Sequence, residues 1–315
     1  MRIVFMGTPD FAAECLKAVY NHPAAEIVGV LTQPDTQKGR GMKLIPSPVK
    51  VFATEHALPV YQPETLKNGA FAEELKALDP ELIFVAAYGK ILPAYVLEYP
   101  KYGCINAHGS LLPLYRGASP IQRAIMDGHT RTGITAMYMA DGIDTGDMLL
   151  KGECDILPED DFGTLHDKLA AIAGDLLCQI IDKALDGTLE ACRCPQNDAE
   201  ATHAPKILKE DTVLDFSRPA CELCCLIRGL SPAPLAMTKT PDGKLLKVAC
   251  AKVVQDAGHS AAPGTVLSLD DGILVACGNG SALRLNAVVP EGKKRMDAAD
   301  YIRGRKLNVG DLLAY

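Results

Sequence analysis

Asn106 and His108 form the pair in this sequence best suited to chemistry at a carbonyl group. Both belong to the apolar run 103–108, which is typical of a buried strand, and residues two apart on a strand point to the same side. An amide donor beside an imidazole can stabilise the negative oxygen that develops when a carbonyl carbon is attacked. An Asn and a His that only cap neighbouring loops would give the same pattern.

A second segment, residues 139–147, supplies carboxylates. It joins two predicted strands and contains Asp141, Asp144 and Asp147. One carboxylate placed against His108 would fix its tautomer and stabilise the imidazolium. Asp is also common in turns, where its side chain bonds the local backbone. We expect one of the three to serve His108 and the other two to be turn formers.

The segment from Gly7 to Asp10 follows the first predicted strand, where nucleotide-binding folds place a phosphate loop. It has one glycine of the three in Gly-x-Gly-x-x-Gly, and no Gly-x-x-x-x-Gly-Lys-Ser/Thr sequence occurs in the chain. The pattern favours a tight turn over a dinucleotide or ATP site.

Five cysteines raise the alternative of a zinc site. Cys192 and Cys194 precede Cys221, Cys224 and Cys225, and four thiolates can hold zinc. The last three fall at i, i+3 and i+4 of a predicted apolar helix, which is the usual spacing of a buried face. We therefore expect reduced thiols and no metal.

Two central segments carry a family resemblance. INAHGSLLPLYRGASPIQRAI (residues 105–125) and ADGIDTGDML (residues 140–149) resemble the folate-dependent formyltransferases, which transfer a formyl group from 10-formyltetrahydrofolate to an amine. MGTPDFA (residues 6–12), TQPDTQKGRGMKLIPSPVK (residues 32–50) and the C-terminal region resemble the members whose acceptor is an aminoacyl-tRNA. The similarity runs from residue 1 to about residue 310.

The resemblance implies roles for individual residues. Asn106 and His108 would hold and polarise the formyl oxygen, and Asp144 would orient His108 and help to move protons. The folate-binding residues would be Ser110, Leu111, Leu112 and Pro113, with Tyr88, Leu92 and Asp141 lining the pterin pocket. The tRNA-binding residues would be Lys38, Arg40 and Lys43 on an inserted loop, and Lys206 and Lys209 in a basic linker. The partners would be 10-formyltetrahydrofolate and the charged initiator methionyl-tRNA.

Two other functions are considered. A formyltransferase or hydrolase that acts on a small-molecule amine would share Asn106, His108 and Asp144 but would not need the basic loop or a second domain. A non-catalytic nucleic-acid-binding protein would not need the three site residues, so their presence argues against it.

The elements that must position these residues indicate two domains. Up to residue 187, short apolar runs alternate with amphipathic stretches, which predicts an open, mostly parallel, doubly wound Rossmann-like sheet. The stretch 64–78 is expected to form one helix, and residues 160–186 a long one. Residues 188–209 lack periodicity and indicate a linker. Residues 210–315 predict a short helix and then closely spaced strands, as in a small β-barrel of the oligonucleotide-binding type.

Composition and charge complete the expectations. The 315 residues are 48% hydrophobic and 23% charged, and no apolar run reaches the ~18 residues of a membrane span. With no secretion signal evident, we expect a cytoplasmic monomer. The net charge of −7 divides into −10 for residues 1–204 and +3 for residues 205–315. The basic cluster Lys293, Lys294 and Arg295 is therefore a candidate polyanion contact, although a solvated charged face would look alike.

Overall fold

The computed structural model describes residues 1–38, 43–254, 257–304 and 307–315. The chain forms two compact units. Unit 1 comprises residues 1–117, 132–155 and 166–203, and unit 2 comprises residues 118–131, 156–165 and 204–315. Among the described residues, no helix has both the length and the apolar character needed to cross a bilayer.

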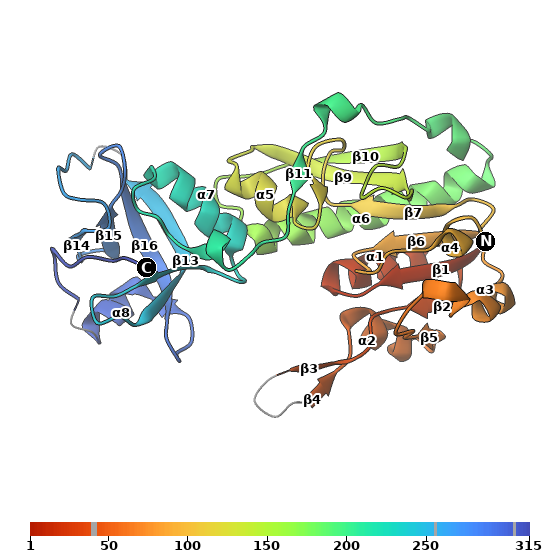
Figure 1. Ribbon diagram of the computed structural model, residues 1–315, viewed down its shortest axis with the longest axis horizontal. Helices are drawn as coiled ribbons and strands as arrows, with labels where there is room; N and C mark the ends of the chain where they lie inside the picture. Colours follow the sequence, from red (N-terminus) through yellow and green to blue (C-terminus); the bar gives the residue numbers. More distant parts are fainter. Residues whose placement is uncertain (39–42, 255–256, 305–306) are drawn as a thin grey trace. The chain divides into compact units, whose positions relative to one another are not determined.

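Unit 1 is built on a seven-stranded sheet of order β10-β9-β7-β6-β1-β2-β5 (Figure 1). The strands are β1 (Arg2–Gly7), β2 (Glu26–Leu31), β5 (Val60–Tyr61), β6 (Leu82–Ala86), β7 (Cys104–His108), β9 (Arg131–Tyr138) and β10 (Met148–Asp155). From β5 to β7 all neighbouring strands are parallel, and β9 runs antiparallel to β7. β1, β6 and β7 are buried on both faces, which explains their continuous apolar sequences.

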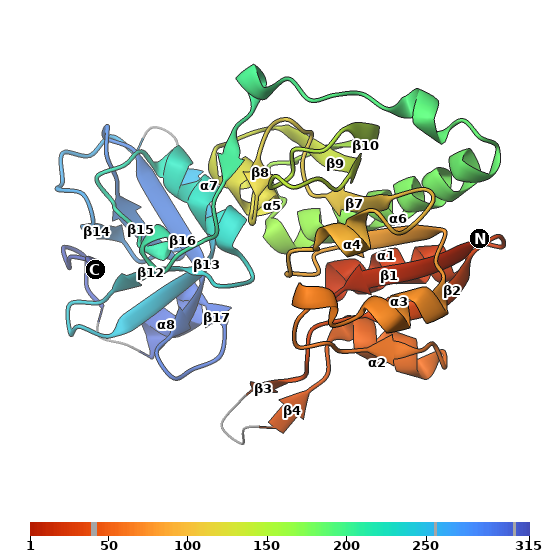
Figure 2. The same ribbon diagram turned by 45° about the vertical axis from the view of Figure 1, so that its right-hand side comes forward.

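Helices cover both faces of this sheet (Figure 2). The helices are α1 (Asp10–Tyr20), α2 (Pro48–Glu55), α3 (Ala72–Leu78), α4 (Ala94–Leu97) and α6 (Phe162–Leu185). Val4 and Met6 of β1 share a hydrophobic cluster with residues of α3 and α4. α1 packs on the opposite face of β1, because a Cβ on Gly7 would meet Ala12 at 2.5 Å. α6 lies beside α1, where Cys178 Sγ is 3.5 Å from the Ala18 carbonyl. The predicted doubly wound arrangement is confirmed.

The predicted helix over residues 64–78 is interrupted. A 3₁₀ turn η1 (Lys67–Gly69) precedes α3, and both Asn68 (φ 55°) and Gly69 (φ 74°) have left-handed backbones. Because a right-handed helix cannot continue through such residues, the helix starts again only at Ala72.

Short elements complete unit 1. β3 (Thr36–Lys38) and β4 (Lys43–Ile45) form an antiparallel hairpin, and β8 (Arg116–Gly117) follows β7. Between α6 and unit 2 the chain contains only the 3₁₀ turns η2 (Leu189–Cys192) and η3 (Asp198–Glu200) and the two-residue strand β11 (His203–Ala204).

Unit 2 contains a curled antiparallel sheet of order β12-β13-β16-β15-β14, with β17 beside β16. The strands are β12 (Ala236–Lys239), β13 (Leu245–Val254), β14 (Val266–Ser268), β15 (Ile273–Ala276), β16 (Ala282–Pro290) and β17 (Met296–Asp297). The helical elements are α5 (Pro120–Met126), η4 (Glu210–Thr212), α7 (Ala220–Leu230) and α8 (Ala298–Arg303). α7 and α8 contribute apolar side chains to the core of this half-barrel. The curled sheet confirms the small β-barrel predicted for the C-terminal domain.

Candidate functional site

The candidate site is centred on β7, in the middle of the unit 1 sheet. In the ladders, Asn106 pairs with Val85 of β6 and with Met137 of β9, so its backbone is held on both sides. His108 ends the strand with only 5% of its surface exposed. Asn106, half-buried, lies two residues earlier and therefore points to the same face.

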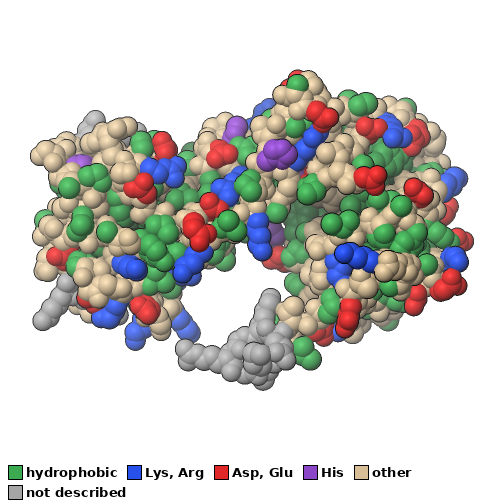
Figure 3. Space-filling view, in the orientation of Figure 1, with side chains coloured by type: hydrophobic (Ala, Val, Ile, Leu, Met, Phe, Trp, Pro, Cys, Tyr) green, Lys and Arg blue, Asp and Glu red, His purple; other side chains and the backbone are tan. Residues whose placement is uncertain are grey.

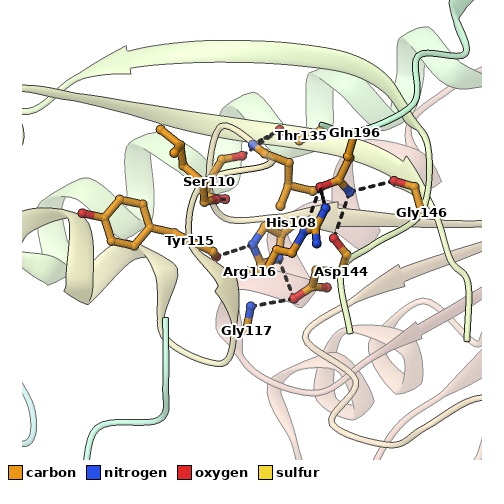
Figure 4. A network of polar contacts seen from close by, with 11 residues as sticks. His108, Ser110, Tyr115, Arg116, Gly117, Thr135, Asp144, Gly146 and Gln196 are labelled. Atoms are coloured by element: carbon orange, nitrogen blue, oxygen red, sulfur yellow. Dashed lines mark hydrogen bonds and ion pairs between the residues drawn. The ribbon is translucent and has the colours of Figure 1, made fainter. Parts of the chain in front are cut away.

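His108 is held between two oxygen atoms (Figure 4). Its Nε2 is 2.9 Å from the carbonyl oxygen of Tyr115, and its Nδ1 is 3.5 Å from Oδ2 of Asp144. A neutral imidazole has one N–H and can satisfy one acceptor, whereas the imidazolium donates from both nitrogens. The ring therefore faces an acceptor at each nitrogen, and Asp144 is placed to act as the counter-ion of the protonated ring.

The 139–147 turn brings Asp144 to His108 because β9 runs antiparallel to β7. Tyr138 at the end of β9 pairs with Ile105, and the Met139 amide donates to the Cys104 carbonyl, so the chain leaves β9 near the start of β7. The turn then extends to His108, where Asp144 has a left-handed backbone (φ 52°). The Gly117 amide donates to Asp144 Oδ2 at 2.8 Å and fixes the carboxylate.

Two residues that the sequence analysis did not assign hold this turn. Gln196 donates from Nε2 to the carbonyl oxygens of Asp144, at 2.9 Å, and Gly146, at 2.7 Å. Its Oε1 accepts from Nε and Nη2 of the buried Arg116. Arg116 lies in the segment 105–125 that carries the family resemblance, but nothing in the sequence pairs it with a glutamine 80 residues later.

The segment from Ser110 to Pro113, expected to contact folate, is rigidly bonded. Thr135 Oγ1 donates to the Ser110 carbonyl at 2.7 Å and accepts from the Leu112 amide at 3.1 Å. Lys151 Nζ donates to the Leu112 carbonyl at 2.6 Å. Ser110 and Leu112 are buried, whereas Leu111 and Pro113 are partly exposed. This fixed loop directly follows the candidate catalytic strand.

The remaining predicted folate residues fall into two classes. The side chains of Tyr88 and Leu92 lie in the hydrophobic cluster of unit 1, and Met139 packs against the same cluster. Burial raises the pKa of Tyr88 to about 12. Asp141 is exposed on the 139–147 turn. Two apolar side chains near these residues are exposed. Ile91 (91% exposed) lies in the loop after β6, and Ile143 (77% exposed) lies on the 139–147 turn.

The base of the β3–β4 hairpin is also an ordered polar site. Lys50 Nζ contacts both carboxylate oxygens of Asp35, and Gln62 Nε2 donates to Asp35 Oδ1. These bonds hold the pKa of Asp35 below its ordinary value. A pocket of about 350 Å³ adjoins the hairpin base. It is lined by Thr8, Pro9, Asp10, Gln33, Pro34, Thr36, Ile45, Pro46, Ser47 and Pro48.

The residues expected to contact tRNA lie in three places. Lys38 is on β3 and Lys43 on β4, whereas Arg40 lies outside the described residues. In unit 2, Lys206 and Lys209 are exposed before η4. Lys293, Lys294 and Arg295 are exposed in the turn between β16 and β17. Over the face shown in Figure 3, Lys and Arg side chains are interspersed with Asp and Glu.

The cysteines do not assemble into a ligand set within the part of the chain that the structure describes, where no three His, Cys, Asp or Glu side chains are grouped to hold a metal ion. Cys224 lies at a packed position on α7, with Sγ 3.5 Å from the Ala251 carbonyl, and its burial raises the pKa of the thiol.

Comparison with known proteins identifies the family. The Formyl transferase profile matches residues 1–181, and the Formyl transferase C-terminal domain profile matches residues 206–306. The chain is 48% identical over 314 residues to the methionyl-tRNA formyltransferase of Caldanaerobacter subterraneus, covering 99% of this chain and 100% of the relative. It is 46% identical to the methionyl-tRNA formyltransferase of Bacillus subtilis, covering 99% and 97%.

A solved structure supports the fold. The N-formyltransferase of Helicobacter canadensis, in complex with folinic acid and dTDP-3-aminofucose, superposes with a TM-score of 0.66 at 17% identity, covering 90% of this chain and 98% of that one. Because two family profiles together match most of the chain, and full-length relatives exceed 40% identity, the chain belongs to the formyl transferase family.

Proposed function

We propose that this protein transfers the formyl group of 10-formyltetrahydrofolate to the α-amine of initiator methionyl-tRNA. The observation that carries the proposal is the His108–Asp144 pair at the end of β7, in a chain that resembles methionyl-tRNA formyltransferases along its whole length. The product is N-formylmethionyl-tRNA, which serves translation initiation.

The loops around β6 and β9 fit a pterin. A pterin presents flat apolar faces and an edge of N–H donors. The exposed Ile91 and Ile143 offer apolar contacts, and the exposed Asp141 offers a carboxylate that can accept from that edge. Tyr88 and Leu92 act through the core, by fixing the loop that carries Ile91. The hydrogen-bonded Ser110–Pro113 loop is already fixed in position to contact the part of the folate beyond the pterin.

The chemistry requires stabilisation of a developing oxyanion. 10-formyltetrahydrofolate supplies the formyl carbon when bound. As the acceptor amine adds to the formyl carbon, the Asn106 amide donates to the formyl oxygen, and His108 donates to it from Nε2 once that oxygen replaces the Tyr115 carbonyl as the acceptor. Asp144 remains the counter-ion of His108 and takes the amine proton through water. The bond between the formyl carbon and the donor nitrogen then breaks, and the proton passes to the departing nitrogen, so that tetrahydrofolate leaves.

The hairpin is the part of unit 1 proposed to receive the acceptor. Lys38, Arg40 and Lys43 supply phosphate contacts, and the pocket at the hairpin base shares Thr36 and Ile45 with the two strands. Lys206 and Lys209 of the linker, and Lys293, Lys294 and Arg295 of unit 2, supply contacts elsewhere on the tRNA. The protein acts as a monomer in the cytoplasm, where charged tRNA is used.

The test is formyl transfer from 10-formyltetrahydrofolate to charged initiator tRNA, with glycinamide ribonucleotide as a competing acceptor. We expect formylated tRNA, no formylated ribonucleotide, and no product with His108→Ala. Preferential formylation of the ribonucleotide would instead establish a small-molecule acceptor. Binding of tRNA without transfer to either acceptor would identify a non-catalytic binding protein.

A further inference from the structure

We infer that Gln196 is a positioning residue for the reaction and that Arg116 holds it in place. The inference rests on the proposed function, because it concerns how Asp144 is kept against His108. It assigns a role to residues 193–202, which lie between the two regions matched by the family profiles.

Gln196 bonds the backbone of the turn that carries Asp144. One amide nitrogen reaches two carbonyl oxygens, those of Asp144 and Gly146, at 2.9 and 2.7 Å (Figure 4). These bonds fix the turn on both sides of residue 145. The fixed turn presents the Asp144 carboxylate to the Gly117 amide and to His108.

Arg116 fixes the orientation of the Gln196 amide. Its Nε and Nη2 lie 3.0 and 2.8 Å from Gln196 Oε1, so the oxygen faces the guanidinium and the NH₂ group faces the turn. The Arg116 side chain is 8% exposed, and Nη2 also pairs with Asp198 at 2.7 Å. The Arg116 guanidinium is therefore directed at the Gln196 amide and at Asp198, and little of it is exposed to solvent.

The neighbouring chain is anchored on both sides of Gln196. Cys194 exchanges two backbone hydrogen bonds of 2.8 Å with Met148, just after the turn. Thr202 accepts from the Arg116 amide with its carbonyl and from the Tyr115 amide with its hydroxyl. Tyr115 provides the carbonyl that faces His108 Nε2. Residues 193–202 thus contact the two backbone segments, at Asp144 and at Tyr115, that hold the His108 ring.

The decisive variant is Gln196→Glu. It keeps the length of the side chain and its bonds to Arg116, but it replaces the donor toward the Asp144 and Gly146 carbonyls with an oxygen. We expect kcat to fall about 10- to 100-fold, because small displacements of a catalytic group have effects of this order. KM for tRNA should stay within about twofold; KM for the donor is not used as a control, because Asp141 and Ile143 of the same turn are proposed to contact the pterin. The control is Asn197→Ser, an exposed neighbour whose substitute can still accept from the Ala199 amide.

A double-mutant cycle separates positioning from general destabilisation. If Gln196 acts through Asp144, Gln196→Glu should cost little further activity in an Asp144→Asn background. The free enzyme gives a second readout, the NMR signal of the His108 Nδ1 proton. We expect Gln196→Glu to weaken this signal while the melting temperature stays near that of the parent.

Multiplicative effects in the cycle, or an unchanged His108 signal, would overturn the positioning role. Parental kcat in Gln196→Glu would overturn it as well. If Gln196→Glu fails to fold, Gln196→Met removes the donor without added charge, and Arg116→Lys serves beside it as the control for the loss of the Arg116–Gln196 bonds. Parental activity in Asp144→Asn and His108→Ala would instead refute the proposed function itself.

Discussion

The amide nitrogen of Gly117 lies 2.8 Å from Oδ2 of Asp144, the same carboxylate oxygen that faces His108 Nδ1 at 3.5 Å. The backbone donor is the closer of the two, so the carboxylate is fixed independently of the protonation of the ring. The candidate counter-ion is thus in place before substrate arrives, which is the condition under which electrostatic stabilisation is most effective.

Removing the groups proposed to contact the formyl oxygen should slow the chemical step. We expect Asn106→Ala and His108→Ala each to reduce kcat roughly 10²- to 10³-fold. Asp144→Asn should also be severe, because an amide cannot balance the imidazolium. Single-turnover formyl transfer measures the step, and equilibrium binding of the donor is the control. Near-parental turnover in His108→Ala would exclude the mechanism.

Tyr88→Phe should leave catalysis intact and remove a cost in stability. Tyr88 Oη is buried without a hydrogen-bond partner among the described residues. Its removal should leave the free energy of unfolding unchanged or raise it by about 1 kcal/mol at neutral pH. KM for the donor should stay at the parental value, because the hydroxyl lies in the core. A raised KM would mean that the hydroxyl contacts folate.

The same variant makes a pH prediction. Burial raises the pKa of Tyr88 to about 12, while an unfolded tyrosine ionises near ~10. The unfolded state therefore loses this proton first, and the free energy of unfolding should fall as the pH rises from about 10 to about 12. Tyr88→Phe should reduce that fall in urea titrations. Tyr20→Phe, at an exposed tyrosine of α1, is the control.

Neutralising the hairpin should separate capture of tRNA from chemistry. With Lys38, Arg40 and Lys43 all changed to Gln, we expect a higher KM for charged tRNA and an unchanged KM for the donor. The reason is that these residues contact only the acceptor in the proposed function. Lys76→Gln, an exposed lysine of α3, is the control. A parallel rise in both KM values would show instead that the hairpin shapes the whole site.

The basic turn of unit 2 should contribute to the salt dependence of tRNA binding. Each phosphate contact adds about one unit to the slope of log K against log salt concentration. Changing Lys293, Lys294 and Arg295 to Glu should therefore raise KM for tRNA and flatten the slope. An equal charge change at the exposed Lys17, Lys76 and Lys101 of unit 1 is the control. Identical slopes for the two variants would make the turn a solvated face.

The strands and helices of unit 1 could be predicted because local sequence determines them. α1 is one of the amphipathic stretches of the predicted alternation, with Phe11, Ala12, Cys15, Leu16 and Val19 buried at helical spacing. The break at Asn68 and Gly69 could not be predicted by periodicity, because both residues leave the amphipathic pattern intact while their backbones turn left-handed. Hydrophobic spacing reports which face is buried, not where a helix stops.

The candidate site was predictable only where its residues share one strand or one turn. Asn106 and His108 follow from strand geometry. Residue spacing left Asp144 as one of three acids in one turn; the family resemblance singled it out, and the structure places it against His108. Gln196 left no signal, since the stretch around it has no periodicity and its partners are 50 to 80 residues away. Side-chain bonds between distant loops depend on the finished fold.

The discontinuous make-up of unit 2 has a consequence for recombination between relatives. α5 comes from residues 118–131 of the chain, yet Met126 packs against the core formed by residues after 204. A Cβ on Gly229 of α7 would meet Met126 Cγ at 2.5 Å, so the two helices are fitted to each other closely. A chimera joined by one crossover near residue 204 would therefore set α5 of one parent against α7 of the other. Exchanging residues 118–131 together with the C-terminal region would keep each core from a single parent.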